Sequence, residues 1–158
     1  SLEELNFKKN HQEWSVLECI EHLNLYGIFY LPEIEACILG SNEYQKQGQF
    51  KSSLIGDFFV NSVKASNNKK IKAIKMMIPD KSNLSLITID QFIKQLEKLK
   101  SLLHQAKMMN LMKIKTSISL TKLFKLRLGD TFRFLAHHNE RHILQAEKLI
   151  STNPPILD

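Results

Sequence analysis

Apolar residues recur at helical spacing along almost the whole chain, while the residues that break helices are scarce. The 158 residues include only five glycines and four prolines. Apolar side chains that repeat every three or four positions turn one face of a helix toward a core, and few breakers leave such helices long. The sequence therefore predicts an all-α protein. Its length suits a single domain, residues 1–158, with a core of its own.

The first long helix is expected over residues 14–39, because a stripe of apolar side chains runs through it and Gly40 follows it. Pro32 removes one backbone donor inside this stretch, so we expect a kink or a local break about one turn earlier. The stripe consists of Val16, Ile20, Leu23, Ile28, Leu31, Ile34 and Ile38.

A helix from about residue 89 to 107 is expected to follow a capping box, in which Thr88 and Gln91 satisfy backbone donors at its start. Residues 108–126 have no clear period, and their three methionines are expected to fill gaps in the core. Two further helices are expected, at residues 53–63 and 128–150. The core face of the 89–107 helix is expected to carry Phe92, Leu96, Leu99 and Leu103.

Composition and charge narrow the environment of the protein. The net charge of +6 is mainly due to lysine, and the stretch from Lys64 to Lys81 could attract phosphates. That stretch lacks interleaved aromatic and arginine side chains, so a solvated loop is favoured over nucleic-acid binding. The apolar runs are too short to cross a membrane. Cys19 and Cys37 lie too far apart on one helix to form a disulfide within the chain, which predicts a reducing, cytoplasmic location.

Two histidines four residues apart, His138 and His142, lie on one face of the last predicted helix and can converge on a metal ion. The distant His22 could supply a third nitrogen. The spacing alone is also consistent with core histidines that hydrogen-bond to ordinary partners. Zincin chemistry is disfavoured, because Asn139 stands where that motif requires glutamate.

Two segments together carry a resemblance to a known family. They resemble the DinB-like superfamily, also called DinB/YfiT-like metalloenzymes, from about Ser1 to Ile150. In that family the first segment opens the second helix of a four-helix bundle and the second lies on the last helix. The segments are Trp14-Ser15-x-x-Glu18-x-x-x-His22-Leu23 and His138-x-x-Arg141-His142-x-x-Gln145.

The resemblance implies an up-down-down-up four-helix bundle with additional short helices, whose first helix is truncated or missing before Leu2. It also implies a divalent metal at His22, His138 and His142 with an open position. Zinc is the default metal, and nickel, iron and manganese are alternatives. Such a site would activate a water or a low-molecular-weight thiol toward a small-molecule substrate, as a hydrolase or a thiol-dependent transferase. A bacterial homodimer is implied as well.

Other side chains are assigned roles around this site. Glu18 is a candidate catalytic residue that could orient His22 or accept a proton, or else pair with a lysine at the surface. Gln145 could hydrogen-bond across the bundle. Arg141 is expected to form a structural ion pair, for example with a glutamate of the first long helix. Trp14 is expected to anchor the core rather than to contact substrate.

An alternative function comes from a different class. The chain could be a non-catalytic helical module that binds a partner or responds to stress, with a structural metal or none. His11, His104 and His137 are expected to be ordinary residues under either function.

Overall fold

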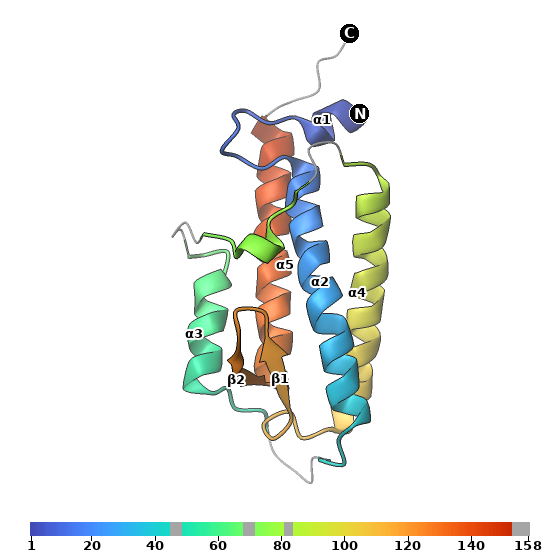
Figure 1. The fold of residues 1–158 in the computed structure, drawn as a ribbon, viewed down its shortest axis with the longest axis vertical. Helices are drawn as coiled ribbons and strands as arrows, with labels where there is room; N and C mark the ends of the chain where they lie inside the picture. The colour runs from blue at the N-terminus through green and yellow to red at the C-terminus, as the bar shows by residue number, and fades with distance from the viewer. Residues whose placement is uncertain (45–48, 68–71, 81–83, 153–158) are drawn as a thin grey trace.

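The computed structural model describes residues 1–44, 49–67, 72–80 and 84–152. Helices dominate it (Figure 1), which confirms the predicted mostly helical fold. A two-stranded hairpin is the departure from all-α. The elements are α1 Leu2–Asn6, α2 Val16–Leu39, α3 Leu54–Val63, the 3-10 helix η1 Lys75–Met77, α4 Ile87–Gln105, the 3-10 helix η2 Ala106–Met108, β1 Lys115–Ile118, β2 Thr121–Arg127 and α5 Leu128–Thr152.

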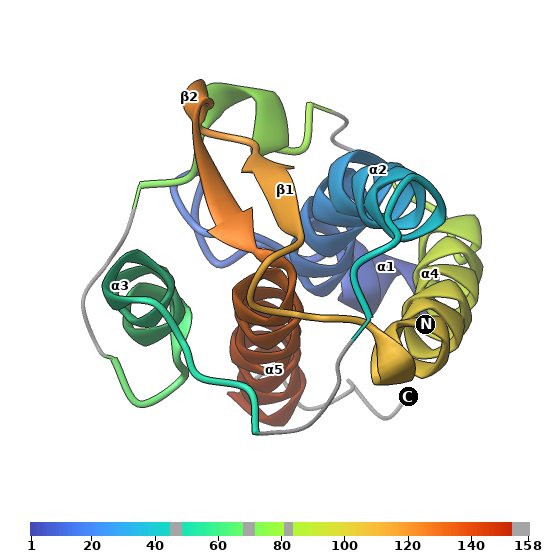
Figure 2. The ribbon, with the colours of Figure 1, turned by 90° about the horizontal axis from the view of Figure 1, so that it is seen from below.

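Helix α2 lies between α4 and α5 and packs against both (Figures 1 and 2). The colours of Figure 1 show that α2 and α4 run in the same direction and that α5 runs in the opposite one. The complete up-down-down-up order of a four-helix bundle stays a prediction. The shorter α3 packs on the side of α5 that faces away from α4 (Figure 2). Between Ser1 and Trp14 the only helix is α1, which has five residues.

Helix α2 begins at a capping box. The Ser15 side chain accepts from the Glu18 backbone N–H, and the Glu18 carboxylate accepts from the Ser15 N–H. Helix α2 continues through Pro32, so the predicted local break is wrong, and the alternative of a kink stays a prediction. Both Pro32 and Ile28, whose carbonyl loses its partner, are on the solvent side, and Ile28 is 56% exposed. Water can satisfy the freed carbonyl there.

Helix α4 begins two residues earlier than predicted, and Thr88 lies inside it instead of capping it. The backbone turn at Ser85 takes the place of a side-chain cap, because the Thr88 N–H donates to the Ser85 carbonyl. The predicted core face is also rotated. Leu102 is fully buried, whereas Leu103 is 47% exposed.

The hairpin, β1 and β2, lies between η2 and α5, in a stretch where no element was predicted. Strand β1 pairs with β2 in antiparallel register, with an irregularity between Ser117 and Ile118. Met109 is buried as predicted, but Met108 is 68% exposed and fills no gap in the core.

Buried Asp130 joins the start of α3 to the start of α5. Its carboxylate accepts from the backbone N–H and the hydroxyl of Ser53, at 3.1 and 2.8 Å, and also from the hydroxyl of Ser52. Gly56 leaves room for this carboxylate, because a Cβ there would lie 2.0 Å from Asp130 Cγ. Among the described helices, none combines the length and apolarity that a membrane span requires.

Candidate metal site

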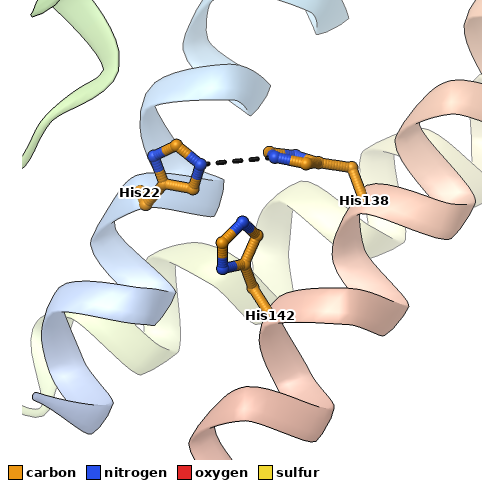
Figure 3. Close-up of side chains that lie close together, drawn as sticks. All are labelled: His22, His138 and His142. Carbon is orange, nitrogen blue, oxygen red and sulfur yellow. Dashed lines mark hydrogen bonds between the residues drawn. The ribbon is translucent and has the colours of Figure 1, made fainter. Parts of the chain in front are cut away.

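Three histidines meet in the interior of the helical bundle. His22 comes from the second turn of α2, and His138 and His142 come from successive turns of α5 (Figure 3). One ring nitrogen from each lies within 4.8 Å of the other two, and all three residues are buried. The closest pair is Nε2 of His22 and Nε2 of His138, at 3.3 Å. The structure therefore brings together the three residues that the sequence singled out.

Two of the three rings are oriented by a hydrogen bond on the nitrogen that faces away from the others. Nδ1 of His22 lies 2.5 Å from the carbonyl oxygen of Met77, and Nδ1 of His142 lies 3.0 Å from Oε1 of Gln145. Each partner is an acceptor, so each ring carries its proton on Nδ1 and leaves Nε2 bare. This arrangement orients metal-binding histidines.

The third ring is held by packing. His138 stacks on Phe134, with ring centroids 5.4 Å apart and an interplanar angle of 11°. It also contacts Tyr26, with ring centroids 4.2 Å apart. Its Nδ1 has no hydrogen-bond partner within the described part of the chain. Aromatic neighbours one turn away on α5 and across on α2 thus determine the orientation of this ring.

Burial favours the neutral form of all three rings. It lowers the pKa of His22 to about 4, although the hydrogen bond to Met77 opposes this effect. It lowers the pKa of His142 to about 3, with a contribution from His22. Burial, the neighbouring rings and the charge of Arg141 hold the pKa of His138 well below its ordinary value. Neutral imidazole is the form that binds a metal.

The donor set fits a divalent transition metal. Two imidazole nitrogens bound tetrahedrally at about 2.0–2.1 Å from one ion lie about 3.3 Å apart. This value matches the separation between Nε2 of His22 and Nε2 of His138. With His22 protonated on Nδ1, its bare Nε2 can accept the hydrogen bond from Nε2–H of His138 (Figure 3), and a metal ion would take the place of that proton between the two rings.

A comparison with models of known protein families identifies the family of this chain. The family model of the DinB superfamily matches residues 1–146, which include all three histidines. The chain belongs to the DinB superfamily. Comparisons with curated proteins and with solved structures give no significant match. The family assignment thus agrees with the two segments that suggested it.

The histidine cluster of this DinB-superfamily chain opens into a cavity of about 470 Å³. All three histidines line it, together with aromatic side chains that the sequence reasoning did not assign to the site. The spacing could have indicated two of them, because Tyr26 follows His22 and Phe134 precedes His138 by four residues. The aromatic lining residues are Trp14, Tyr26, Tyr30, Phe59 and Phe134.

Trp14 packs against an apolar cluster, as predicted, and it also lines the cavity. Its ring is partly buried against the apolar cluster of Val16, Cys19 and Ala146. It also contacts the ring of His22, at a centroid distance of 4.7 Å, and lines the cavity. The capping box of α2 follows directly, so the start of the helix holds this indole over the site.

The carboxylate of Glu18 is engaged away from the histidines. One oxygen accepts from the Ser15 backbone and the other lies 2.9 Å from Nζ of Lys8. The lysine pairing proposed as the alternative is therefore present, but it is buried on the glutamate side and not at the surface. Glu18 secures the start of α2, and a catalytic role for it stays a prediction.

Arg141 and Gln145 flank His142 on α5. Gln145 bonds to its own helix neighbour His142, and within the described residues it makes no hydrogen bond across the bundle. Arg141 donates to the carbonyl oxygens of Lys64 and Asn67, at 3.0 and 2.7 Å. These acceptors belong to the end of α3 and the segment after it, whereas a glutamate of the first long helix was predicted as the partner.

The remaining histidines and the buried cysteine lie outside the cluster. His137 pairs with Glu140 at 3.1 Å, and His11 and His104 are exposed. Burial raises the pKa of the Cys19 thiol to about 12, so this side chain is no nucleophile near neutral pH. Of the lysine-rich stretch, Lys72 reaches the cavity lining, while Lys69, Lys70 and Lys81 lie outside the described residues.

Proposed function

We propose that this chain is a metal-dependent enzyme in which His22, His138 and His142 hold a divalent ion and leave one coordination position open toward the cavity. The observation that carries this proposal is the convergence of three neutral imidazoles at the wall of a cavity. A structural metal site is closed by a fourth protein ligand, whereas a catalytic site keeps an open position. Among the described residues no cysteine or carboxylate completes the cluster as a fourth ligand.

When bound, such an ion lowers the pKa of a water or thiol at its open position and thereby supplies a nucleophile near neutral pH. The chain's own residues do the rest. Met77 and Gln145 keep His22 and His142 in the tautomer that turns Nε2 inward. The aromatic wall excludes bulk water from one side of the site, which strengthens electrostatic interactions there. Hydrolysis and thiol transfer are both compatible with this arrangement.

Several finer predictions belong to the proposal. Zinc stays the default, and nickel, iron and manganese accept the same ligands. A thiol co-substrate, a homodimer and a cytoplasmic location are predictions from the resemblance and from the two free cysteines. They require separate measurements.

Metal stoichiometry in matched variants tests the ligand assignment. The protein is purified without a metal-affinity column, and its metal content is measured by elemental analysis. His138→Ala should bind far less than one equivalent, whereas His137→Ala should bind as much as the wild type. His137 is the matched control, since it is the next residue on α5 and faces away from the cluster. Equal stoichiometry in the two variants would remove the assignment.

Cobalt substitution tests the open position. Addition of a small thiol such as 2-mercaptoethanol to the cobalt-loaded protein should produce a thiolate-to-cobalt charge-transfer band. A closed structural site would leave the spectrum unchanged. That result would favour the non-catalytic module over the enzyme.

A further inference from the structure

The cavity beside the histidines has one continuous aromatic wall. Tyr26 and Tyr30 lie nearly parallel on successive turns of α2, with centroids 6.0 Å apart and an interplanar angle of 13°. The ring of Phe134 on α5 lies beside both tyrosine rings, with centroid distances of 6.0 Å to Tyr26 and 5.8 Å to Tyr30. Flat apolar groups pack well against such a wall, and a volume of about 470 Å³ is typical of small-ligand pockets.

The charges around the same cavity are unbalanced. Among the described lining residues the charged side chains are those of Glu13, Lys72 and Arg141, so cations outnumber anions even without a metal. A divalent metal ion bound by neutral ligands would increase this excess of positive charge. An anion entering the cavity therefore meets a positive field within low-dielectric walls.

The two cations are held in different ways. Arg141 lies next to His142 on α5, and its bonds to the Lys64 and Asn67 carbonyls keep the guanidinium at the cavity. Lys72 is exposed at the cavity lining and comes from the segment that leads to η1. The same segment ends at Met77, whose carbonyl orients His22. The positive side of the cavity is thus built next to the metal ligands.

We infer that the cavity binds an organic monoanion with a flat apolar body, whose carboxylate faces Lys72 and Arg141 and whose ring packs on Tyr26, Tyr30 and Phe134. This inference names the substrate class of the proposed enzyme and rests on that proposed function. Binding of the anion itself, however, needs only the cavity and its charges. The substrate class can therefore be measured separately from catalysis.

Trp14 supplies the readout. It is the only tryptophan of the chain, and it lines the cavity in contact with His22. Its emission is followed while 3-phenylpropionate, 3-phenylpropionamide or acetate is added to zinc-loaded and to chelator-treated protein. The amide has the shape of the acid without its charge, and acetate has the charge without the ring.

We expect 3-phenylpropionate to give a saturable change, with a Kd about tenfold lower than that of the amide or of acetate. Lys72→Gln should raise the Kd for the acid about threefold to tenfold and leave that for the amide unchanged. Lys75→Gln is the matched control, because Lys75 is exposed in the same segment and does not line the cavity. It should leave both constants unchanged.

The outcomes separate this inference from the proposed function. No saturable change with the acid, equal affinity for acid and amide, or equal effects of the two lysine variants would overturn the inference. Each of these results leaves metal stoichiometry untouched. Conversely, charge-selective binding in protein that takes up no metal would refute the proposed enzyme and retain the anion site.

Discussion

Acidification of the metal-free protein should destabilise it over a defined pH range. An unfolded histidine titrates near pH 6.5, whereas burial lowers the pKa of folded His22 to about 4 and that of folded His142 to about 3. Between these limits the unfolded chain binds protons that the folded chain does not bind, so stability falls as the pH falls. Above pH 6.5 the rings are neutral in both states, and their contribution no longer changes with pH.

The magnitude follows from these pKa values. For His22, a pKa lowered from 6.5 to about 4 corresponds to about 3 kcal/mol at ~1.4 kcal/mol per pH unit. His142 contributes a loss of similar order. Local opening would admit water and reduce the total, so we expect a loss of ~3–6 kcal/mol between about pH 7 and pH 4. This loss is comparable with the whole stability of many domains, ~5–15 kcal/mol.

Urea unfolding in the presence of a chelator, followed by the circular dichroism of the helices, measures this loss at each pH. Carboxylates titrate in part of the same range, so the comparison with a variant isolates the histidines. In His22→Asn/His142→Asn the dependence on pH should become much shallower, while His137→Asn should retain the wild-type slope. A double variant with the same slope as the wild type would refute the reasoning.

Three further outcomes follow from the contacts described above. Gln145→Leu removes the acceptor of the His142 Nδ1 proton, and metal affinity by competition with a chromophoric chelator should fall about 10–100-fold. Leu102→Ala should lower the free energy of unfolding by ~2–5 kcal/mol, whereas Leu103→Ala, at an exposed site, should change it by less than ~1 kcal/mol. Gly56→Ala should cost ~1–3 kcal/mol or more in urea unfolding, because its Cβ would overlap the pinned Asp130 carboxylate.

The sequence predicted the parts of the fold that depend on period and on local chemistry. The apolar stripes of α2 and α5 agree with burial except at Ile28, which was predicted on the core face and is exposed. His138 and His142 share a face because they are i and i+4 positions of one helix. It was harder to predict which side of α4 faces the core. Its apolar residues occupy more than half of the helix surface, so periodicity alone does not choose between Leu102 and Leu103 as the buried position.

The sequence signal for the hairpin is short, and local sequence carries no signal for the cavity. Ile114, Thr116 and Ile118 alternate as buried residues of a strand do, and this signal was present in residues 108–126. The Met77 carbonyl carries no side-chain signal at all. Lys72 was grouped with a solvated loop, because only the tertiary fold brings that segment to the histidines.

The two orienting contacts should tolerate mutation very differently during evolution. Every residue type offers a carbonyl oxygen, so position 77 can change its side chain and still anchor His22, provided that the backbone path survives. Position 145 has no such freedom, since the acceptor for His142 is a side-chain amide. Homologues that share this architecture should therefore vary at the first position within the limits of packing and restrict the second to residues with an acceptor of similar reach.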